Sequence, residues 1–133
     1  MEDMQRIFEK DQFANHCGIE LLEAANGNSL AKMVIQDCHR NALGIVHGAA
    51  IFTLADLAFA MASNSHGTAA VAVNVGITYH KAAMNGTLTA EAVEVARNFK
   101  LASYTINVTD DGGDLIATFQ GMVYRKKDKI SEL

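Results

Sequence analysis

The stretch GAAIFTLADLAFAMASNS, residues 48–65, decides the fold of this chain. Its apolar residues recur at helical spacing on one side, and a second set fills the opposite side, so the pattern predicts a helix that is apolar almost all round. A helix of this kind is usually buried inside a protein. Only a narrow stripe of small or polar residues differs, and it comprises Ala49, Thr53, Asp56, Ala60 and Ser63.

The segments on either side of this helix have the patterns of β-strands. Before it, residues 18–26 and 29–37 flank the turn Asn26-Gly27-Asn28, because Asn-Gly supplies the positive φ angles that tight hairpins need. Residues 38–46 are expected to form a loop. After the helix, four apolar or alternating segments predict strands, and they are residues 69–80, 86–96, 101–109 and 115–125.

Two details refine this sheet. Within residues 86–96 the apolar alternation shifts by one, to Val93 and Val95, which predicts a bulge. The run Asp110-Asp111-Gly112-Gly113 is a strong hairpin signal between the last two strands. Because long strands are joined by short turns, the sequence predicts an antiparallel sheet curved around the one buried helix, which is an α+β fold.

Length and composition indicate one domain over residues 1–133. Half of the 133 residues are apolar and 20% are charged, which is typical of a globular domain. Residues 1–16 have weak helical patterning and are expected to cover one edge of the fold. The charged tail KKDKISEL, residues 126–133, is expected to fray.

The residue counts exclude several classes of protein. The formal net charge is −4, and unaided nucleic-acid binding needs a basic face. Only two cysteines are present, with no Cys-x-x-Cys, which excludes a disulfide scaffold or a zinc finger and suits the cytoplasm. The five histidines lack the His-Glu-x-x-His spacing of a zinc helix, so we expect no metal and no cofactor. No signal peptide or membrane-length apolar run is visible.

Asp56 is unusual because it places a carboxylate midway along an otherwise apolar helix. One interpretation is that it marks a solvent-facing stripe, since lone helix carboxylates are usually exposed. The other is an acid or base held in a partly dry cleft, where burial raises its pKa. The small residues beside it would leave room for a substrate or for a second subunit.

A second candidate feature is the expected start of the helix at His47-Gly48. Unpaired backbone N–H groups and the positive end of the helix dipole gather at such a terminus. Gly48 has no side chain, so a substrate oxygen could approach its N–H closely and be polarised. Asn41 could aim its amide at the same point. The alternatives are an ordinary capped terminus and, for Asn41, a turn residue that stabilises its own loop.

Together the loop and helix resemble the signature of hotdog-fold acyl-CoA thioesterases, specifically the PaaI-like branch named after phenylacetic acid degradation. The residues that carry the resemblance are His39-x-Asn41-x-x-Gly44-x-x-His47-Gly48, then Leu54-x-Asp56-x-Ala58. The likeness extends from Phe13 to Tyr124. It includes the later segments VNVGITYHKAA (73–83) and DDGGDLIATFQGMVY (110–124).

The resemblance implies a hotdog fold, in which five or six antiparallel strands wrap around the long helix. It implies homodimers, commonly paired into homotetramers, with active sites between subunits. The implied reaction is hydrolysis of an acyl-CoA thioester, with an aryl or medium-chain acyl group, to the free acid and CoA. The expected partners are therefore a small-molecule acyl-CoA and other copies of this chain, and neither nucleic acid nor membrane.

By the same resemblance, Asp56 would be the general base or the nucleophile. The Gly48 N–H would polarise the thioester carbonyl, and Asn41 would hold that carbonyl or the attacking water. His47 would support the loop and contact the thioester region. Asp56 would meet Asn41 and Gly48 of the opposite subunit.

Coenzyme A carries phosphates, so basic residues should line the mouth of its tunnel. The resemblance indicates Lys81, Arg97 and Lys100 for this role, with Tyr79 nearby. The alternative is ordinary solvated surface charge.

Three positions depart from the family pattern. Ala49 stands where many members have a second glycine. Residues 71–74 (VAVN) lack the hydroxyl that positions water in some members, so either Asn74 or Asn41 substitutes for it or the water is held less firmly. Asn98 stands where a turn glycine is usual, and asparagine tolerates a positive φ.

Two other functions remain open at this point. One is a catalytically silent acyl-CoA-binding or regulatory hotdog module, and the other is a hotdog hydratase or dehydratase. The presence of Asp56, Asn41 and Gly48 together favours the hydrolase. Hydratases usually rely on a histidine and a carboxylate in a different motif, which this sequence lacks.

Overall fold

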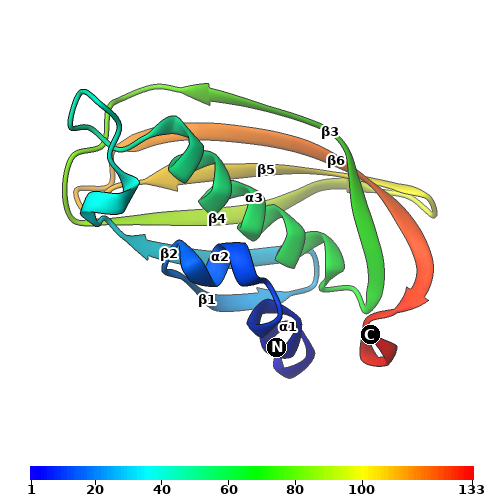
Figure 1. The fold of residues 1–133 in the computed structure, drawn as a ribbon. Coiled ribbons are helices and arrows are strands. Elements are labelled where there is room, and N and C mark those ends of the chain that lie inside the picture. Colours follow the sequence, from blue (N-terminus) through cyan, green and yellow to red (C-terminus); the bar gives the residue numbers. More distant parts are fainter.

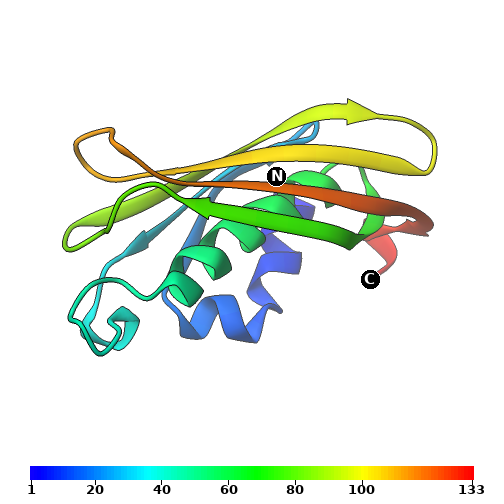
Figure 2. The same ribbon diagram turned by 90° about the horizontal axis from the view of Figure 1, so that it is seen from above.

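The helix at the centre of the molecule is α3, Gly48–Asn64, and one curved sheet wraps around it (Figure 1; Figure 2). The computed structural model describes residues 1–133. Leu54, Ala55, Ala58 and Ala62 of α3 have no exposed surface. The nearly all-round apolar pattern therefore predicted the burial of this helix correctly.

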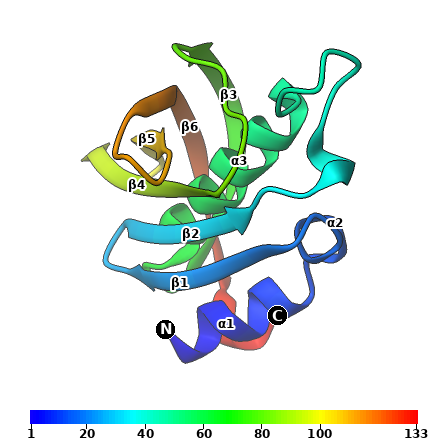
Figure 3. The same ribbon diagram turned by 90° about the vertical axis from the view of Figure 1, so that its left-hand side faces the viewer.

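Six strands form the sheet, and all neighbouring pairs are antiparallel, in the order β1-β2-β4-β5-β6-β3. The predicted architecture is thus confirmed. The other elements, in chain order, are α1 (Glu2–Glu9), α2 (Gln12–His16), β1 (Ile19–Ala25), β2 (Asn28–Val34), η1 (Asp37–His39), β3 (Thr68–Tyr79), β4 (Thr87–Arg97), β5 (Leu101–Thr109), β6 (Leu115–Lys129) and η2 (Ile130–Glu132). Helices α1 and α2 lie beside β1 at one edge of the sheet, and β3 forms the other edge (Figure 3).

A row of aromatic rings fixes α3 against the sheet. The ring of Phe59 packs on Gly121 of β6, where a Cβ atom would lie only 2.6 Å from the ring. Phe59 also meets Tyr104 of β5 edge to face, with ring centroids 5.8 Å apart. Phe52 contacts Phe119 of β6 in the same way at 5.3 Å. Such edge-to-face pairs add specificity to the burial of apolar area.

The predicted hairpin turn and bulge are both present, with one difference. Asn26 has φ 55° and Gly27 φ 85°, as a tight turn requires. The register of β4 shifts between Glu94 and Ala96, which confirms a bulge. However, Val93 and Val95 are exposed, and Glu94 is the residue turned toward the helix side. The second predicted strand is also shorter than expected, since β2 ends at Val34.

The expectation of a frayed tail at residues 126–133 is wrong. Strand β6 continues to Lys129 and the turn η2 follows it. Ile130 is buried in the core, and the Arg6 guanidinium of α1 donates to the carbonyls of Ile130 and Leu133 at 3.0 and 2.6 Å. The buried isoleucine and the cation hold a segment whose charged composition alone suggests disorder.

Candidate active site

Asp56 is a half-buried carboxylate on α3 without a hydrogen-bond or ion-pair partner in its own chain. Burial raises the pKa of this carboxyl, and the nearby carboxylate of Asp11 at the start of α2 raises it further. Desolvation and a like charge both disfavour the ionised form. The Asp56 carboxylate is neither fully exposed nor fully buried. It therefore lies in the partly dry environment that acid–base chemistry favours.

The start of α3 leaves one backbone donor free. The N–H of Ala49 donates to Nδ1 of His47 at 2.9 Å, and those of Ala50 and Ile51 donate to the His47 carbonyl. Gly48 is the only residue of this first turn whose N–H has no acceptor within the chain. His47 is therefore the N-cap of the helix, and its ring supports the terminus. The free Gly48 N–H lies at the positive end of the helix dipole, where it could stabilise a developing oxyanion.

Tyr79 at the end of β3 holds this helix start from the side. Its hydroxyl donates to the Gly48 carbonyl at 2.9 Å. A Cβ atom at Gly48 would lie 3.1 Å from Cζ and from the hydroxyl oxygen of Tyr79. Because Gly48 has no side chain, it leaves room for the Tyr79 ring. This is a second reason for a glycine at this position, and the sequence did not reveal it.

Asn41 lies in the loop before α3, and its side chain stabilises the turn that it belongs to. Its Oδ1 accepts from the Leu43 N–H at 3.0 Å, and its backbone is closed by bonds with Gly44 and Ile45. Its Nδ2 group has no acceptor within the chain. The side chain is therefore held in place by its oxygen while its amide donors stay available.

Within one chain these groups do not converge on a single point. Asn41, His47, Gly48 and Tyr79 gather at the N-terminal end of α3, whereas Asp56 lies about 12 Å further along the axis, at about 1.5 Å per residue. A carbonyl held at the Gly48 N–H is therefore out of reach of Asp56 in the same subunit.

The remaining predicted residues lie apart. Asn74 is on the outer face of β3, because its neighbour Val75 pairs with the buried Gly121 and alternate residues face opposite sides. Lys81 is ion-paired with Asp114 and, at 3.6 Å, with Asp110; the hydrogen bond to Asp114 raises its pKa.

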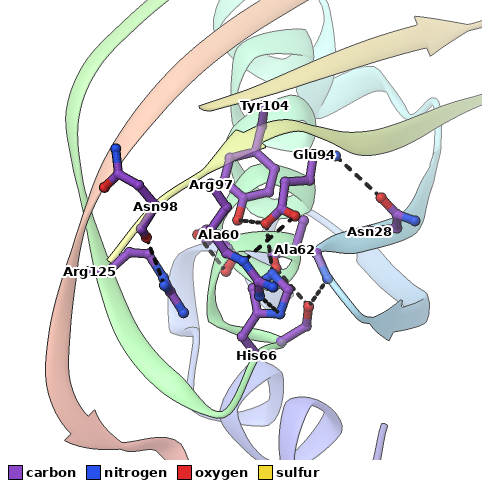
Figure 4. A network of polar contacts seen from close by, with 12 residues as sticks. Asn28, Ala60, Ala62, His66, Glu94, Arg97, Asn98, Tyr104 and Arg125 are labelled. Atoms are coloured by element: carbon purple, nitrogen blue, oxygen red, sulfur yellow. Dashed lines mark hydrogen bonds and ion pairs between the residues drawn. The ribbon is translucent and has the colours of Figure 1, made fainter. Parts of the chain in front are cut away.

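Arg97 belongs to a polar network at the far end of the sheet (Figure 4). Glu94 accepts hydrogen bonds from His66 at 2.7 Å and from the Tyr104 hydroxyl at 2.9 Å, and Arg97 contacts both His66 and Glu94. Burial favours a higher pKa for the Glu94 carboxyl, but the bonds from His66 and Tyr104 outweigh it and leave the pKa below its usual value.

Lys100 lines a basic groove of about 790 Å³ at the same end of the molecule. Two aromatic side chains and further cations line it as well: Phe99, Tyr124, Arg125, Lys126 and Lys127. Sequence reasoning missed these cations because it treated the tail as frayed. The visible signal was the Arg-Lys-Lys run that directly continues an apolar strand.

The structure gathers no group of three or more His, Cys, Asp or Glu side chains that could hold a metal ion. None of its helices combines the length and the apolar character needed to cross a membrane. Cys17 and Cys38 are both free thiols.

Comparison with known proteins places these features in a family. The family model of the thioesterase superfamily matches residues 43–117. A putative esterase of Archaeoglobus fulgidus is 44% identical over 120 residues, covering 90% of this chain and 78% of that protein. The acyl-coenzyme A thioesterase PaaI of Escherichia coli is 30% identical over 125 residues, covering 93% and 89%.

A solved structure agrees with the sequence matches. The structure of the E. coli PaaI protein from the phenylacetic acid degradation operon superimposes with a TM-score of 0.92 at 29% identity, covering 96% of this chain and 94% of that one. The chain therefore belongs to the thioesterase superfamily, and its six-stranded sheet around one long helix is a hotdog fold.

Proposed function

We propose that this chain hydrolyses acyl-CoA thioesters to the free acid and CoA, with each active site shared by two copies. The observation that carries the proposal is the unpartnered, half-buried carboxylate of Asp56, whose raised pKa suits a base. Membership of the thioesterase superfamily supports the reaction class. The similarity to an acyl-coenzyme A thioesterase, PaaI of E. coli, supports acyl-CoA as the substrate. We further propose aryl or medium-chain acyl groups and a cytoplasmic location.

The second copy would pair along β3. This edge strand is 12 residues long and exposes Val71, Val73 and Val75 on a free edge, which favours pairing with another strand. Antiparallel pairing of β3 with itself across a two-fold axis brings opposite ends of the two strands together. An offset between the two strands would place the Gly48 end of one copy beside the middle of α3 in its partner, where Asp56 lies. Such a pairing would replace the separation of about 12 Å within one chain by a contact between two chains.

The basic groove is suited to the nucleotide end of CoA. Lys100, Lys126 and Lys127 offer charges for phosphates, and Phe99 and Tyr124 offer flat faces for the adenine. The groove lies at the Thr68 end of β3. In the proposed pair it would face the Tyr79 end of the other copy, so one CoA would extend from one subunit's groove to its partner's Gly48. Tyr79 and Lys81 of one subunit would thereby join Arg97 and Lys100 of the other.

In the proposed mechanism the thioester carbonyl oxygen accepts from the Gly48 N–H and from Nδ2 of Asn41. Asp56 of the other copy takes a proton from water as the water oxygen attacks the carbonyl carbon. The C–S bond then breaks, and CoA leaves as the thiolate that takes up a proton. Direct attack by the carboxylate, through a mixed anhydride, is the alternative. Label from ¹⁸O-labelled water in the Asp56 carboxylate after turnover would establish the anhydride route, because general-base attack by water leaves the carboxylate oxygens unchanged.

We also propose that two such dimers join into a tetramer through the outer face of the sheet. Leu101 of β5 and Met122 of the neighbouring β6 expose apolar surface there. Light scattering measures the mass of the assembly in solution. A monomer that hydrolyses acyl-CoA would contradict the shared site.

The test of the reaction is thiol release from a panel of acyl-CoA substrates. Asp56→Asn should lower turnover by about 10²-fold or more, because a positioned acid–base group contributes that much. Glu20→Gln is the matched control, since Glu20 is an exposed carboxylate that pairs only with Lys32 on β2. Unchanged turnover in the Asp56→Asn variant would refute the catalytic assignment, and no thiol release from any acyl-CoA would refute the function.

A further inference from the structure

The loop that connects η1 to α3 carries the proposed donors, and it is mostly exposed. Asn41 lies near its start, His47 and Gly48 lie at its end, and Gly44 turns the chain with φ 83°. Backbone donors stabilise a transition state only when they are held in a fixed position. The contacts that hold this loop therefore bear directly on catalysis.

Arg40 makes most of the side-chain contacts of this loop. One terminal nitrogen of its guanidinium donates to the Gly44 carbonyl at 3.0 Å and to the Met84 carbonyl at 2.7 Å. The other donates to Oδ1 of Asn85 at 3.1 Å, and Nε lies 3.4 Å from Asp37. The Arg40 side chain is only 25% exposed. A single planar group thus joins the loop tip to the connection between β3 and β4.

That connection is itself anchored. Its Lys81 pairs with Asp114 and Asp110 of the hairpin turn between β5 and β6. Its Ala83 carbonyl accepts from the Val46 N–H at 2.9 Å, next to the start of α3. Arg40 therefore fastens the loop to a fixed point rather than to another mobile segment.

The loop is held on its inner side by His39, which is buried. Its Nδ1 accepts from the Gln36 N–H at 3.0 Å, so Nε2 carries the proton and donates to the Cys17 carbonyl at 2.7 Å. The His39 carbonyl accepts from the His47 N–H at 2.7 Å. With this side fixed, Arg40 supplies the side-chain hydrogen bonds that join the exposed tip to the connection between β3 and β4.

We propose that Arg40 is a positioning residue for hydrolysis, which holds the loop so that Asn41 and the Gly48 N–H point at the substrate carbonyl. This inference rests on the proposed function. Three acceptors from two segments match the planar fork of a guanidinium, which the point charge of a lysine cannot satisfy together. No contact of Arg40 with the substrate is required.

The test compares Arg40→Met, Arg40→Lys and Arg6→Met. Arg6 is the matched control, because it also donates to two backbone carbonyls from a part-exposed side chain, but at the C-terminal segment. Arg40→Met should lower kcat by about 10- to 100-fold, as loosened oxyanion donors do, with KM within about twofold. Arg40→Lys should lie in between, and Arg6→Met should keep the wild-type kcat.

Amide hydrogen exchange supplies a readout that does not depend on activity. Residues 41–48 should exchange faster in Arg40→Met than in the wild type, and not in Arg6→Met. A wild-type kcat in Arg40→Met, or equal losses in Arg40→Met and Arg6→Met, would overturn the inference while leaving the proposed function intact. Absence of thioester hydrolysis in the wild type would refute the proposed function, and unchanged exchange at residues 41–48 would then refute the positioning role separately.

Discussion

Replacing Gly48 by proline should remove the proposed oxyanion donor from an otherwise intact helix start. The Gly48 N–H has no acceptor within the chain, so its loss breaks no internal hydrogen bond. Gly48 is the first residue of α3, where proline is tolerated. The preceding residue, His47, has φ −63° and ψ 136°, the extended conformation that a following proline demands.

The only local cost of this substitution is crowding of Tyr79. A Cβ atom at Gly48 would lie 3.1 Å from Cζ and the hydroxyl oxygen of Tyr79, so that ring must shift by a few tenths of an ångström. Tyr79 is 48% exposed and can move. Gly48→Ala brings the same Cβ but keeps the N–H, so the ratio of the two variants isolates the donor.

We expect Gly48→Pro to hydrolyse acyl-CoA about 10²- to 10³-fold more slowly than Gly48→Ala, which is the usual effect of losing one oxyanion donor. Thiol release gives the rates, and circular dichroism and light scattering establish that both variants are folded and equally assembled. Equal rates in two folded variants would refute the role of this N–H. Asn41 would then have to polarise the carbonyl.

Four further outcomes are expected. Co-expressed Asp56→Asn and Asn41→Ala chains should recover about a quarter of wild-type activity, because half of random pairs are mixed and each mixed pair has one intact site of two; no recovery would contradict a shared site. The kcat/KM should fall on the acidic side with a midpoint above the ordinary value of 3.8 for Asp56. Because the pKa of Asp56 is raised in the folded state, its ionisation destabilises the fold at a pH above that pKa. Thermal denaturation should therefore give Asp56→Asn a higher melting temperature than the wild type at pH 7. At a pH below the ordinary pKa of Asp56, the two melting temperatures should be equal. The paired substitution of Lys126 and Lys127 by alanine should raise KM for acyl-CoA by about tenfold, as loss of charge-assisted phosphate contacts does, and leave it unchanged for acyl-pantetheine, which lacks the nucleotide; equal KM changes for both substrates would rule out a phosphate role.

Much of the site is local enough to be seen in the sequence. The Asn41 turn, the His47 cap and the free Gly48 N–H depend on residues a few positions apart. Residues this close in the chain define their geometry through turn and capping rules. The contacts of Arg40 with residues 84–85 and the hydroxyl of Tyr79 on Gly48 join segments more than 30 residues apart, and no local pattern indicates them.

The amino-acid sequence by itself determined the buried helix, the succession of strands and the hairpin turn at Asn26-Gly27. Hydrophobic periodicity and turn propensity depend on residues only a few positions apart, so they can be recognised in the sequence. Only the tertiary structure decided that β3 lies at the free edge and that β6 continues through the basic tail. Strand order and the packing of Ile130 depend on contacts between distant segments of the chain. No single stretch of sequence encodes the apolar area that these contacts bury together.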